Sequence, residues 1–413
     1  MNIRSRVFLK ALFALKGNLR AGAKPRPRVF DGIAIAPFKN DAQAAASISA
    51  DFELSWAFRQ HPPEVARAQG RRERENFPLL LEIFERCAFP ITWATVGHLF
   101  LERCSRTSHG LAHPEMPRPP RNASWAGDWY MHDPCTNYHE DPLWYAPDLI
   151  AQILESRVPH EIGTHSFSHI DFSPACSNAT LVRRELEESA IAMRRFGVTP
   201  RSLVYPFNRM GHMYHDVLAD MSITAVRHRD RHIRLSYPER MPSGVYKFYE
   251  SMNLRRPKHY RYLDKVKIFI EAAVARCAAF HLWFHPSDPR SVVETELPDI
   301  VRYLDGQRRE GRVWVAPMAE LASYCEARHT LKPEVERTDR EMIVRWRGSF
   351  ASERYGHTDL TLVFPPLPRP RMITVTNGGG SRAVPVAPSS DETAAGRLMI
   401  NMPTTASSLH IRF

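Results

Sequence analysis

Strand-like and helix-like segments alternate through most of this chain, and that alternation constrains its fold more than any other feature. Short β-branched or apolar runs lie at 46–51, 91–96, 202–205, 223–226, 279–284 and 312–315. Between them, apolar residues recur at helical spacing in 77–87, 181–196, 215–221, 262–278 and 297–307. Because helices that alternate with strands in this way usually connect parallel strands, the pattern predicts a parallel barrel or a doubly wound sheet.

The first helix is expected to begin at Phe77, with Asn76 as its cap and Pro78 in its first turn. Near residue 329 the sequence pattern changes, and short runs of alternating apolar and polar residues follow at 342–346, 360–364, 372–376, 397–400 and 408–412. Pro and Gly turn residues separate these runs, which indicates a small all-β, sandwich-like domain. We therefore expect three parts: a basic N-terminal segment at 1–29, an α/β domain at 30–328 and the β-rich domain at 329–413.

The composition is that of a globular chain with a basic surface. Hydrophobic residues make up 43% of the 413 residues and charged residues 24%, which supports a large buried core and argues against disorder. Lys and Arg outnumber Asp and Glu by 56 to 45, but acidic residues interrupt the basic clusters and no aromatic RNA-binding signature occurs. Nucleic acid is therefore not an expected partner. The charge favours an anionic glycan or a membrane surface, or simply a solvated exterior.

The N-terminus and the cysteines bear on where the protein works. Residues 1–19 combine basic and apolar side chains without a small-residue cleavage site, and they are too short to span a bilayer. Either a basic amphipathic helix on a membrane surface or a docking helix is expected there. The six cysteines lie far apart with no C-x-x-C pair, which favours reduced thiols. We expect a cytoplasmic protein, with peripheral membrane association as an alternative; the oligomeric state is not defined by the sequence.

Two histidines, His165 and His169, stand four residues apart in the segment His165-Ser-Phe-Ser-His169. This spacing puts both imidazoles on one face of a helical turn, so both can reach one metal ion. Neutral imidazole suits Zn²⁺, Co²⁺, Ni²⁺ or Fe²⁺. Because the chain has 19 histidines, a chance pair is the alternative.

Two carboxylates follow the first predicted strand, in the segment Asp51-Phe-Glu53. Residues i and i+2 of an extended segment point the same way, so one carboxylate can bind a metal ion while the other acts as a base. A solvated acidic pair is the alternative, although the neighbouring residues are apolar.

A third group lies where the strand at 279–284 runs out into a loop, with His281 and His285 on one face of the strand. Catalytic groups gather at the C-terminal ends of barrel strands, and His285 has that position. His281 lies deeper in the strand and fits a core histidine.

In this chain order, Asp51-Phe-Glu53, His165-Ser-Phe-Ser-His169 and His285-Pro286 resemble the motifs of the polysaccharide deacetylase family, whose members carry the NodB-homology domain. The resemblance covers about residues 46–324 and includes Thr92-Trp-Ala-Thr-Val-Gly97 and His160-Glu-Ile-Gly. It implies a distorted (β/α) barrel with the active site at the C-terminal ends of the strands.

The resemblance also implies the roles of the site residues. Glu53, His165 and His169 would hold a divalent metal ion, foremost Zn²⁺, with Co²⁺ or Ni²⁺ as alternatives. Asp51 would be the catalytic base and His285 the catalytic acid; the reversed assignment of Asp51 and Glu53 is the alternative. The implied reaction is removal of an N- or O-linked acetyl group from a sugar or polysaccharide by metal-activated water.

One motif departs from the family pattern. The family has Arg-x-Pro-Tyr on a middle strand, where the arginine pairs with the catalytic base, but here Val204 stands at the arginine position. Either Arg209 or Arg227 supplies that charge, or the base is oriented differently. The substrate residues implied by the resemblance are Tyr205, Pro206, Phe207, Arg209 and Trp283.

A polar, Pro-rich insertion at 104–143 carries Trp125 and Trp129, with Trp144 just beyond it. It is either the wall of a sugar subsite or a packed lid.

Two other functions fit the same residues. Allantoinase-like amidases, which act on small non-sugar substrates, share the barrel, and a catalytically inactive relative would bind a glycan without hydrolysing it. The β-rich domain and the aromatic insertion favour a glycan. A zincin protease is disfavoured because Ser166 stands where the motif His-Glu-x-x-His has its glutamate.

Overall fold

The computed structural model describes residues 19–258, 260–378, 380–384 and 398–413. The expected membrane-surface or docking helix at the N-terminus lies almost entirely outside these residues. Within the described ranges, no helix combines the length and the apolar character needed to cross a membrane.

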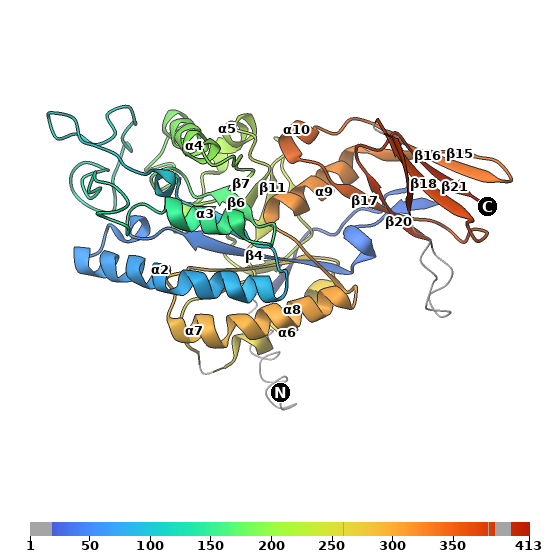
Figure 1. Cartoon of the computed structure of the whole chain (residues 1–413), viewed down its shortest axis with the longest axis horizontal. Helices are drawn as coiled ribbons and strands as arrows, with labels where there is room; N and C mark the ends of the chain where they lie inside the picture. The colour runs from blue at the N-terminus through green and yellow to red at the C-terminus, as the bar shows by residue number, and fades with distance from the viewer. Residues whose placement is uncertain (1–18, 259, 379, 385–397) are drawn as a thin grey trace.

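Parallel strands curl into a distorted barrel, which forms the left-hand part of the molecule in Figure 1. In sheet order the strands are β10 (Glu239–Arg240), β11 (Tyr246–Tyr249), β8 (Ala225–His228), β7 (Ser202–Val204), β6 (Glu161–Thr164), β5 (Thr92–Thr95), β4 (Ala44–Phe52), β13 (Ala279–Phe284) and β12 (Met252–Leu254), with β14 (Val313–Val315) beside the start of β4. Only Glu250 and Ser251 separate β11 from β12, so this segment joins β8 to β13 and closes the sheet. The predicted (β/α) barrel is therefore confirmed.

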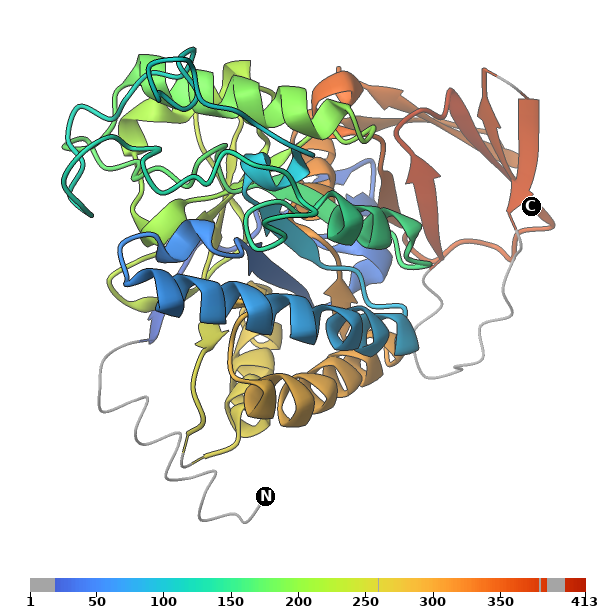
Figure 2. The ribbon, with the colours of Figure 1, turned by 60° about the vertical axis from the view of Figure 1, so that its left-hand side comes forward.

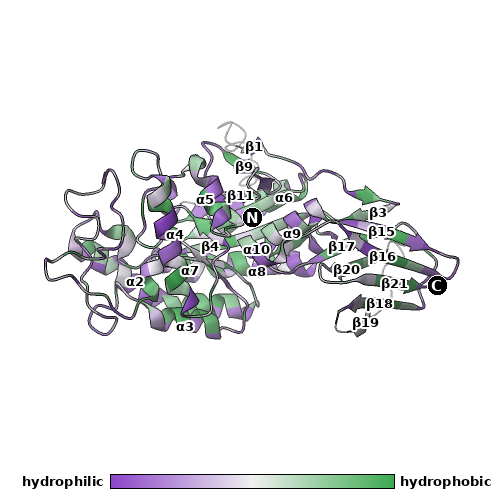
Figure 3. Cartoon of the chain, turned by 90° about the horizontal axis from the view of Figure 1, so that it is seen from above, coloured by the Kyte–Doolittle hydropathy of each residue, from purple (hydrophilic) through white to green (hydrophobic). Residues whose placement is uncertain are grey.

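Helices cover the outside of the barrel, with α2, α7 and α8 on one side and α4 and α5 on the other (Figures 1 and 2). Their bounds are α2 (Pro63–Arg86), α3 (Pro147–Glu155), α4 (Ala179–Arg194), α5 (His215–Asp220), α6 (Tyr262–Val274), α7 (Arg290–Thr295), α8 (Leu297–Arg309) and α9 (Met318–Thr330). These outer helices show both polar and apolar colours in Figure 3, as expected for helices with one face on a core.

The predicted start of the first helix is wrong. Helix α2 begins at Pro63 rather than Phe77, and Pro78 lies inside it. The residues before Asn76 are mostly charged, so the apolar stripe that marks a helix is faint there. Asn76 is not a cap: its side-chain amide is buried and donates hydrogen bonds to the backbone carbonyls of Pro286 and Asp288.

The C-terminal part contains two β-sheets. One has the order β15 (Lys332–Arg337), β16 (Glu341–Arg347), β21 (Ser408–Arg412), β18 (Met372–Asn377), β19 (Gly380–Val384), and the other has the order β2 (Val29–Phe30), β3 (Ile33–Ile35), β17 (Asp359–Val363), β20 (Met399–Pro403). Buried side chains of both sheets, among them Val344, Leu362 and Leu409, belong to one apolar cluster, which confirms an all-β, sandwich-like arrangement. Strands β2 and β3 come from before the barrel; β2 pairs with β3 and β3 pairs with β17, while the domain boundaries themselves stay a prediction.

Helix α9 contacts both β8 of the barrel and β17 of the sandwich and so lies between the two parts. The remaining elements are short: β1 (Leu19–Ala21) pairs with β9 (Ile233–Leu235), and α10 (Ser352–Tyr355) precedes β17.

The insertion between β5 and α3 begins with one short 3₁₀ helix, η3 (Gly97–Phe100), and then runs to residue 146 with only isolated β-bridges. It forms the end of the molecule farthest from the C-terminal sheets (Figure 1).

Gly97 packs so closely against α4 that any side chain there would clash. A Cβ atom on Gly97 would lie 2.7 Å from Ser189 Oγ and 2.9 Å from Ser189 Cα. We expect Gly97→Ala to lower the free energy of unfolding by about 1–3 kcal/mol, as for other overpacked sites, measured by urea denaturation. The matched control is Gly306→Ala in α8, where no atom lies within 4 Å of the new Cβ and a gain of about 0.4–1 kcal/mol is expected. Equal stability of the two variants would contradict the packing described.

Candidate active site

The C-terminal ends of the barrel strands surround a cavity of about 340 Å³. Four of the predicted catalytic and metal-binding residues line it: Asp51, Glu53, His169 and His285. His165 lies directly behind Glu53. The structure therefore brings together the five residues that the sequence singled out, where barrel enzymes carry their active sites.

Glu53 and the two histidines form a compact buried cluster. Glu53 Oε1 lies 2.8 Å from His165 Nε2 and 3.2 Å from His169 Nε2. All three side chains are at most 4% exposed. His165 Nδ1 lies 2.7 Å from the Val204 carbonyl oxygen, which can only accept, so Nδ1 carries the proton. In the neutral imidazole, the Nε2 lone pair then faces the Glu53 carboxylate.

This arrangement fits a metal ion better than a hydrogen bond. A lone pair and a carboxylate oxygen 2.8 Å apart repel one another unless a cation is shared between them. Burial lowers the pKa of His169 to about 4, so this imidazole is also in the neutral form that binds metals. Two imidazoles and one carboxylate are a ligand set of catalytic zinc sites. The residues present thus suit a divalent ion held by Glu53, His165 and His169.

The predicted helical turn for the histidine pair is wrong. Residues 165–169 form a loop after β6, with positive φ angles of 60° at Ser166 and 56° at His169. The backbone N–H groups of Gly97 and His98 donate to the carbonyls of Ser166 and Phe167, over 2.8 and 3.0 Å. The loop turns back on itself, and the imidazole centroids lie 4.9 Å apart. The four-residue spacing therefore serves the site without a helix.

Asp51 is paired with an arginine. Arg227 Nη1 and Nη2 lie 2.5 and 2.7 Å from the two carboxylate oxygens of Asp51, and both residues are 3% exposed. Arg227 also donates to Ser49 Oγ and Asn208 Oδ1, each at 3.1 Å.

The charge that Val204 cannot supply therefore comes from the neighbouring strand β8. Arg209, the other candidate, pairs with Asp171 instead, at 2.5 Å.

His285 lies on the other side of Glu53, with Nε2 3.8 Å from Glu53 Oε2. Its backbone N–H donates to Asp288 Oδ2 at 2.8 Å. Burial alone would lower the pKa of His285, but the negative charge of Glu53 and a hydrogen bond with Asp288 raise it to about 9. His281 is buried, and its Nε2 lies 3.0 Å from Ser49 Oγ, which confirms it as a core histidine.

Three of the five predicted substrate residues line the cavity: Phe207, Arg209 and Trp283. Tyr205 and Pro206 are buried and do not line it. The cavity wall also includes residues that the sequence did not single out: Phe58, His61, Arg229 and Arg255.

The tryptophans of the insertion do not line this cavity. Trp129 and Trp144 are buried, and Trp125 stacks on Trp129 with ring centroids 4.7 Å apart. Arg59 lies 4.6 Å from the Trp129 ring and 4.9 Å from the Trp125 ring. The packing favours a packed lid over the wall of a sugar subsite.

No family model matches this sequence, and no curated protein is similar to it. Solved structures are similar in three dimensions. A protein named as a polysaccharide deacetylase from Mycobacterium smegmatis is 16% identical; the match covers 74% of this chain and 98% of that one, with a TM-score of 0.50. The fold is that of the polysaccharide deacetylases.

Two further structures match less well. Puue allantoinase has a TM-score of 0.46 at 13% identity, over 71% of this chain and 94% of that one. Peptidoglycan deacetylase PdaC from Bacillus subtilis has a TM-score of 0.37 at 10% identity, over 71% and 96%.

Two buried glutamates support the site of this deacetylase fold and were missed in the sequence. Glu73 of α2 accepts hydrogen bonds from the backbone N–H groups of Glu53 and Leu54, each at 3.0 Å. Glu185 of α4 accepts from the backbone N–H and the hydroxyl of Ser168, at 2.8 and 2.6 Å. Each glutamate stands among apolar residues on the inner stripe of its helix, and this is the signal that could have identified both.

The buried pair of Asp51 and Arg227 makes a test of this geometry possible. Arg227→Met would leave the Asp51 carboxylate buried without a partner, so we expect a loss of about 3–5 kcal/mol in the free energy of unfolding. The double variant Asp51→Leu/Arg227→Met should lose less than the sum of the single changes, because neither charge is then left alone. Urea denaturation measures all three.

The matched control is Arg183→Met, which breaks an exposed pair with Asp220 at 2.6 Å. Its expected cost is at most about 1 kcal/mol. If Arg227→Met costs no more than this control, the buried pair does not exist in solution.

Proposed function

We propose that this chain is a metal-dependent hydrolase that removes an acetyl group from an acylated sugar. The observation that carries the proposal is the cavity at the C-terminal ends of the strands, where a ligand set of two imidazoles and a carboxylate lies between the paired carboxylate of Asp51 and the imidazole of His285. A base, an acid and a Lewis-acid site at one cavity are the components of acyl hydrolysis.

Glu53, His165 and His169 would hold the ion, Zn²⁺ in the first place, with Co²⁺ or Ni²⁺ as alternatives. When bound, such an ion supplies Lewis acidity that lowers the pKa of water and polarises the acyl carbonyl. Asp51 takes a proton from the attacking water, whose oxygen forms the new bond to the acetyl carbon. Arg227 donates to both oxygens of Asp51 and so keeps its carboxylate oriented.

His285 acts on the leaving group. Its imidazolium donates a proton to the amine or alkoxide as the acyl C–N or C–O bond breaks, and the products are acetate and the deacetylated sugar. Asp288 accepts a hydrogen bond from the backbone of His285 and its charge favours the protonated ring.

The rest of the cavity supports a sugar substrate with a negative charge. Phe207 is half-buried at the cavity and offers an apolar ring of the kind that packs against sugars, whereas the Arg227 guanidinium lies over the Trp283 ring at 4.3 Å. Three guanidinium groups, those of Arg209, Arg229 and Arg255, lie at the same cavity. Asp171 and Glu250 balance the first two, whereas Arg255 lies over the Trp283 ring at 5.6 Å. Charge complementarity therefore favours an acidic acylated sugar over a neutral one.

Removal of one metal ligand should remove both the metal and the activity. We expect His169→Ala to lose the active-site ion, measured by elemental analysis, and to lose acetate release, because an imidazole and a carboxylate alone hold the ion weakly.

Asp51→Asn is the matched comparison: it should keep the ion but reduce kcat by about 10²–10⁴-fold, the usual contribution of a positioned base. Acetate release that continues unchanged in a chelator would contradict the proposal.

A substrate panel tests the substrate class. The purified chain, loaded with Zn²⁺, is incubated with N-acetylated and O-acetylated sugars, each in a neutral and an acidic form, and with small ureides. We expect acetate from at least one sugar and a higher kcat/KM for its acidic form. Release of product from ureides alone would replace the proposal by amidase activity, and binding of glycan without acetate release would indicate an inactive relative.

A further inference from the structure

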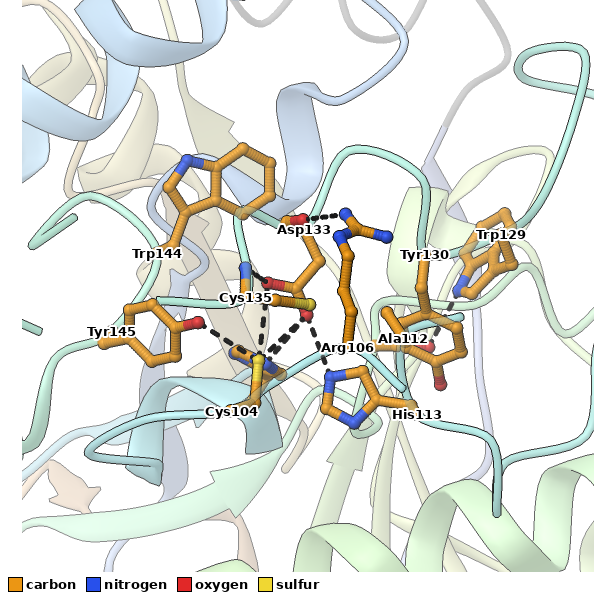
Figure 4. A network of polar contacts seen from close by, with 12 residues as sticks. Cys104, Arg106, Ala112, His113, Trp129, Tyr130, Asp133, Cys135, Trp144 and Tyr145 are labelled. Atoms are coloured by element: carbon orange, nitrogen blue, oxygen red, sulfur yellow. Dashed lines mark hydrogen bonds and ion pairs between the residues drawn. The ribbon is translucent and has the colours of Figure 1, made fainter. Parts of the chain in front are cut away.

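A second group of metal-ligating side chains lies outside the candidate active site, where the insertion leaves the barrel. His98, Cys104, His113 and Asp133 each offer one ligand atom, and the four atoms lie within 4.8 Å of one another. Figure 4 shows Cys104, His113 and Asp133 pointing toward one another from separate stretches of the insertion. None of these residues lines the cavity of the candidate active site.

The distances from Asp133 to the other three groups are close to, and in two cases shorter than, those of a tetrahedral metal site. Asp133 Oδ2 lies 2.8 Å from His113 Nε2, 3.2 Å from His98 Nε2 and 3.5 Å from Cys104 Sγ. Zinc bonds of about 2.0–2.3 Å in a tetrahedral arrangement separate the ligand atoms by about 3.3–3.7 Å. The Asp133 carboxylate thus lies slightly closer to the two imidazoles than it would in a tetrahedral zinc site, and its distance to the thiol is within the expected range.

His98 is the observation that points to a ligand most directly. Its imidazole is completely buried, yet neither ring nitrogen has a partner in good hydrogen-bonding geometry within the described part of the chain. Nε2 faces Asp133 Oδ2 at 3.2 Å, outside hydrogen-bonding geometry. Buried polar groups are rarely left without a partner, and a metal ion among the four side chains would supply the missing one.

We propose that His98, Cys104, His113 and Asp133 bind a structural Zn²⁺ ion. One thiolate and two imidazoles favour Zn²⁺ over Mg²⁺ or Ca²⁺, which prefer oxygen ligands. Four protein ligands leave no open position for water or substrate, so the ion is structural rather than catalytic.

Neighbouring groups orient the ligands as in other zinc sites. Cys135 donates its backbone N–H to Asp133 Oδ1 at 2.9 Å, and the Tyr145 hydroxyl lies 3.1 Å from Cys104 Sγ.

The ion would cross-link a stretch of chain that has no regular secondary structure to hold its shape. From residue 101 to 146 the chain has no helix or extended strand, and its four ligands come from widely spaced positions. A metal site of this kind contributes folding free energy directly. The ion would therefore join distant segments of the insertion where it leaves the barrel, in place of the hydrogen bonds of a sheet.

The same ion would steady the histidine loop of the candidate active site. The backbone N–H of His98 donates to the carbonyl of Phe167 at 3.0 Å, and the Phe167 ring lies 5.6 Å from the His98 ring and 5.5 Å from the His113 ring. Trp129 of the insertion donates from Nε1 to Ser168 Oγ at 2.8 Å. Phe167 and Ser168 stand between the two metal-binding histidines, so the structural ion positions them indirectly.

The test is the metal content of the full-length chain, which does not depend on the proposed activity. Wild type saturated with Zn²⁺ and then dialysed should retain two equivalents by elemental analysis, and Cys104→Ser and His169→Ala should each retain one. The matched control, Cys87→Ser, changes a half-buried thiol elsewhere and should retain two.

Spectroscopy identifies the ligands without relying on a folded variant. Cobalt-substituted wild type and His169→Ala should both show thiolate-to-cobalt charge-transfer absorption, and Cys104→Ser should lack it. X-ray absorption of the zinc-loaded wild type should show a sulfur scatterer. Wild type with one equivalent, no thiolate band and no sulfur scatterer overturns the second site. Two equivalents with a thiolate band but no acetate release overturn the proposed activity instead and leave the structural site standing.

Discussion

The ion pair of Asp51 and Arg227 spans the interior of the barrel, and the geometry of the site depends on it. Asp51 lies on β4 and Arg227 on β8, and β5, β6 and β7 separate these strands in the sheet. The two side chains meet only because the sheet curls. A buried carboxylate without a partner is strongly destabilising. The ion pair therefore stabilises the curled form of the sheet, in which the two side chains meet. The same curl brings Glu53, the histidine loop and His285 to one cavity.

Much of this could be predicted from the sequence, because the information is local. The alternation of strands and helices defines a parallel barrel, and each short motif lies at the end of a strand. The arginine that pairs with Asp51 differs from these motifs, because its role does not follow from local sequence. Arg227 stands 176 residues after Asp51 in a stretch of alternating basic and acidic residues that resembles a solvated surface. Only the folded sheet shows that its guanidinium turns inward to the Asp51 carboxylate.

The predictions that were wrong or incomplete have physical causes. Helix α2 is longer than predicted because its first half presents charged residues to solvent on most sides, which hides the apolar period. The strands from 233 to 254 are short and carry many charged side chains, so neither a period of two nor an apolar run marks them. The helical turn proposed for His165 and His169 rested on spacing alone, whereas backbone hydrogen bonds from η3 and side-chain contacts with Glu185 hold the pair in a loop.

Side-chain contacts, rather than a backbone ladder, hold the insertion against the barrel. The Arg59 guanidinium lies 4.6 Å from the Trp129 ring and 4.9 Å from the Trp125 ring, and its Nη2 donates to the Ser168 carbonyl at 2.6 Å. Burial lowers the pKa of Arg59 to about 10, still high enough to keep its charge at neutral pH. That buried cation is balanced by Glu185, which also fixes Ser168, while the cluster around Asp133 fixes the base of the insertion. The histidine loop thus contacts Arg59 and Glu185 on one side and the proposed zinc site on the other. Movement of the insertion would therefore disturb the loop that carries both histidines of the candidate active site, although no described residue of the insertion lines the cavity.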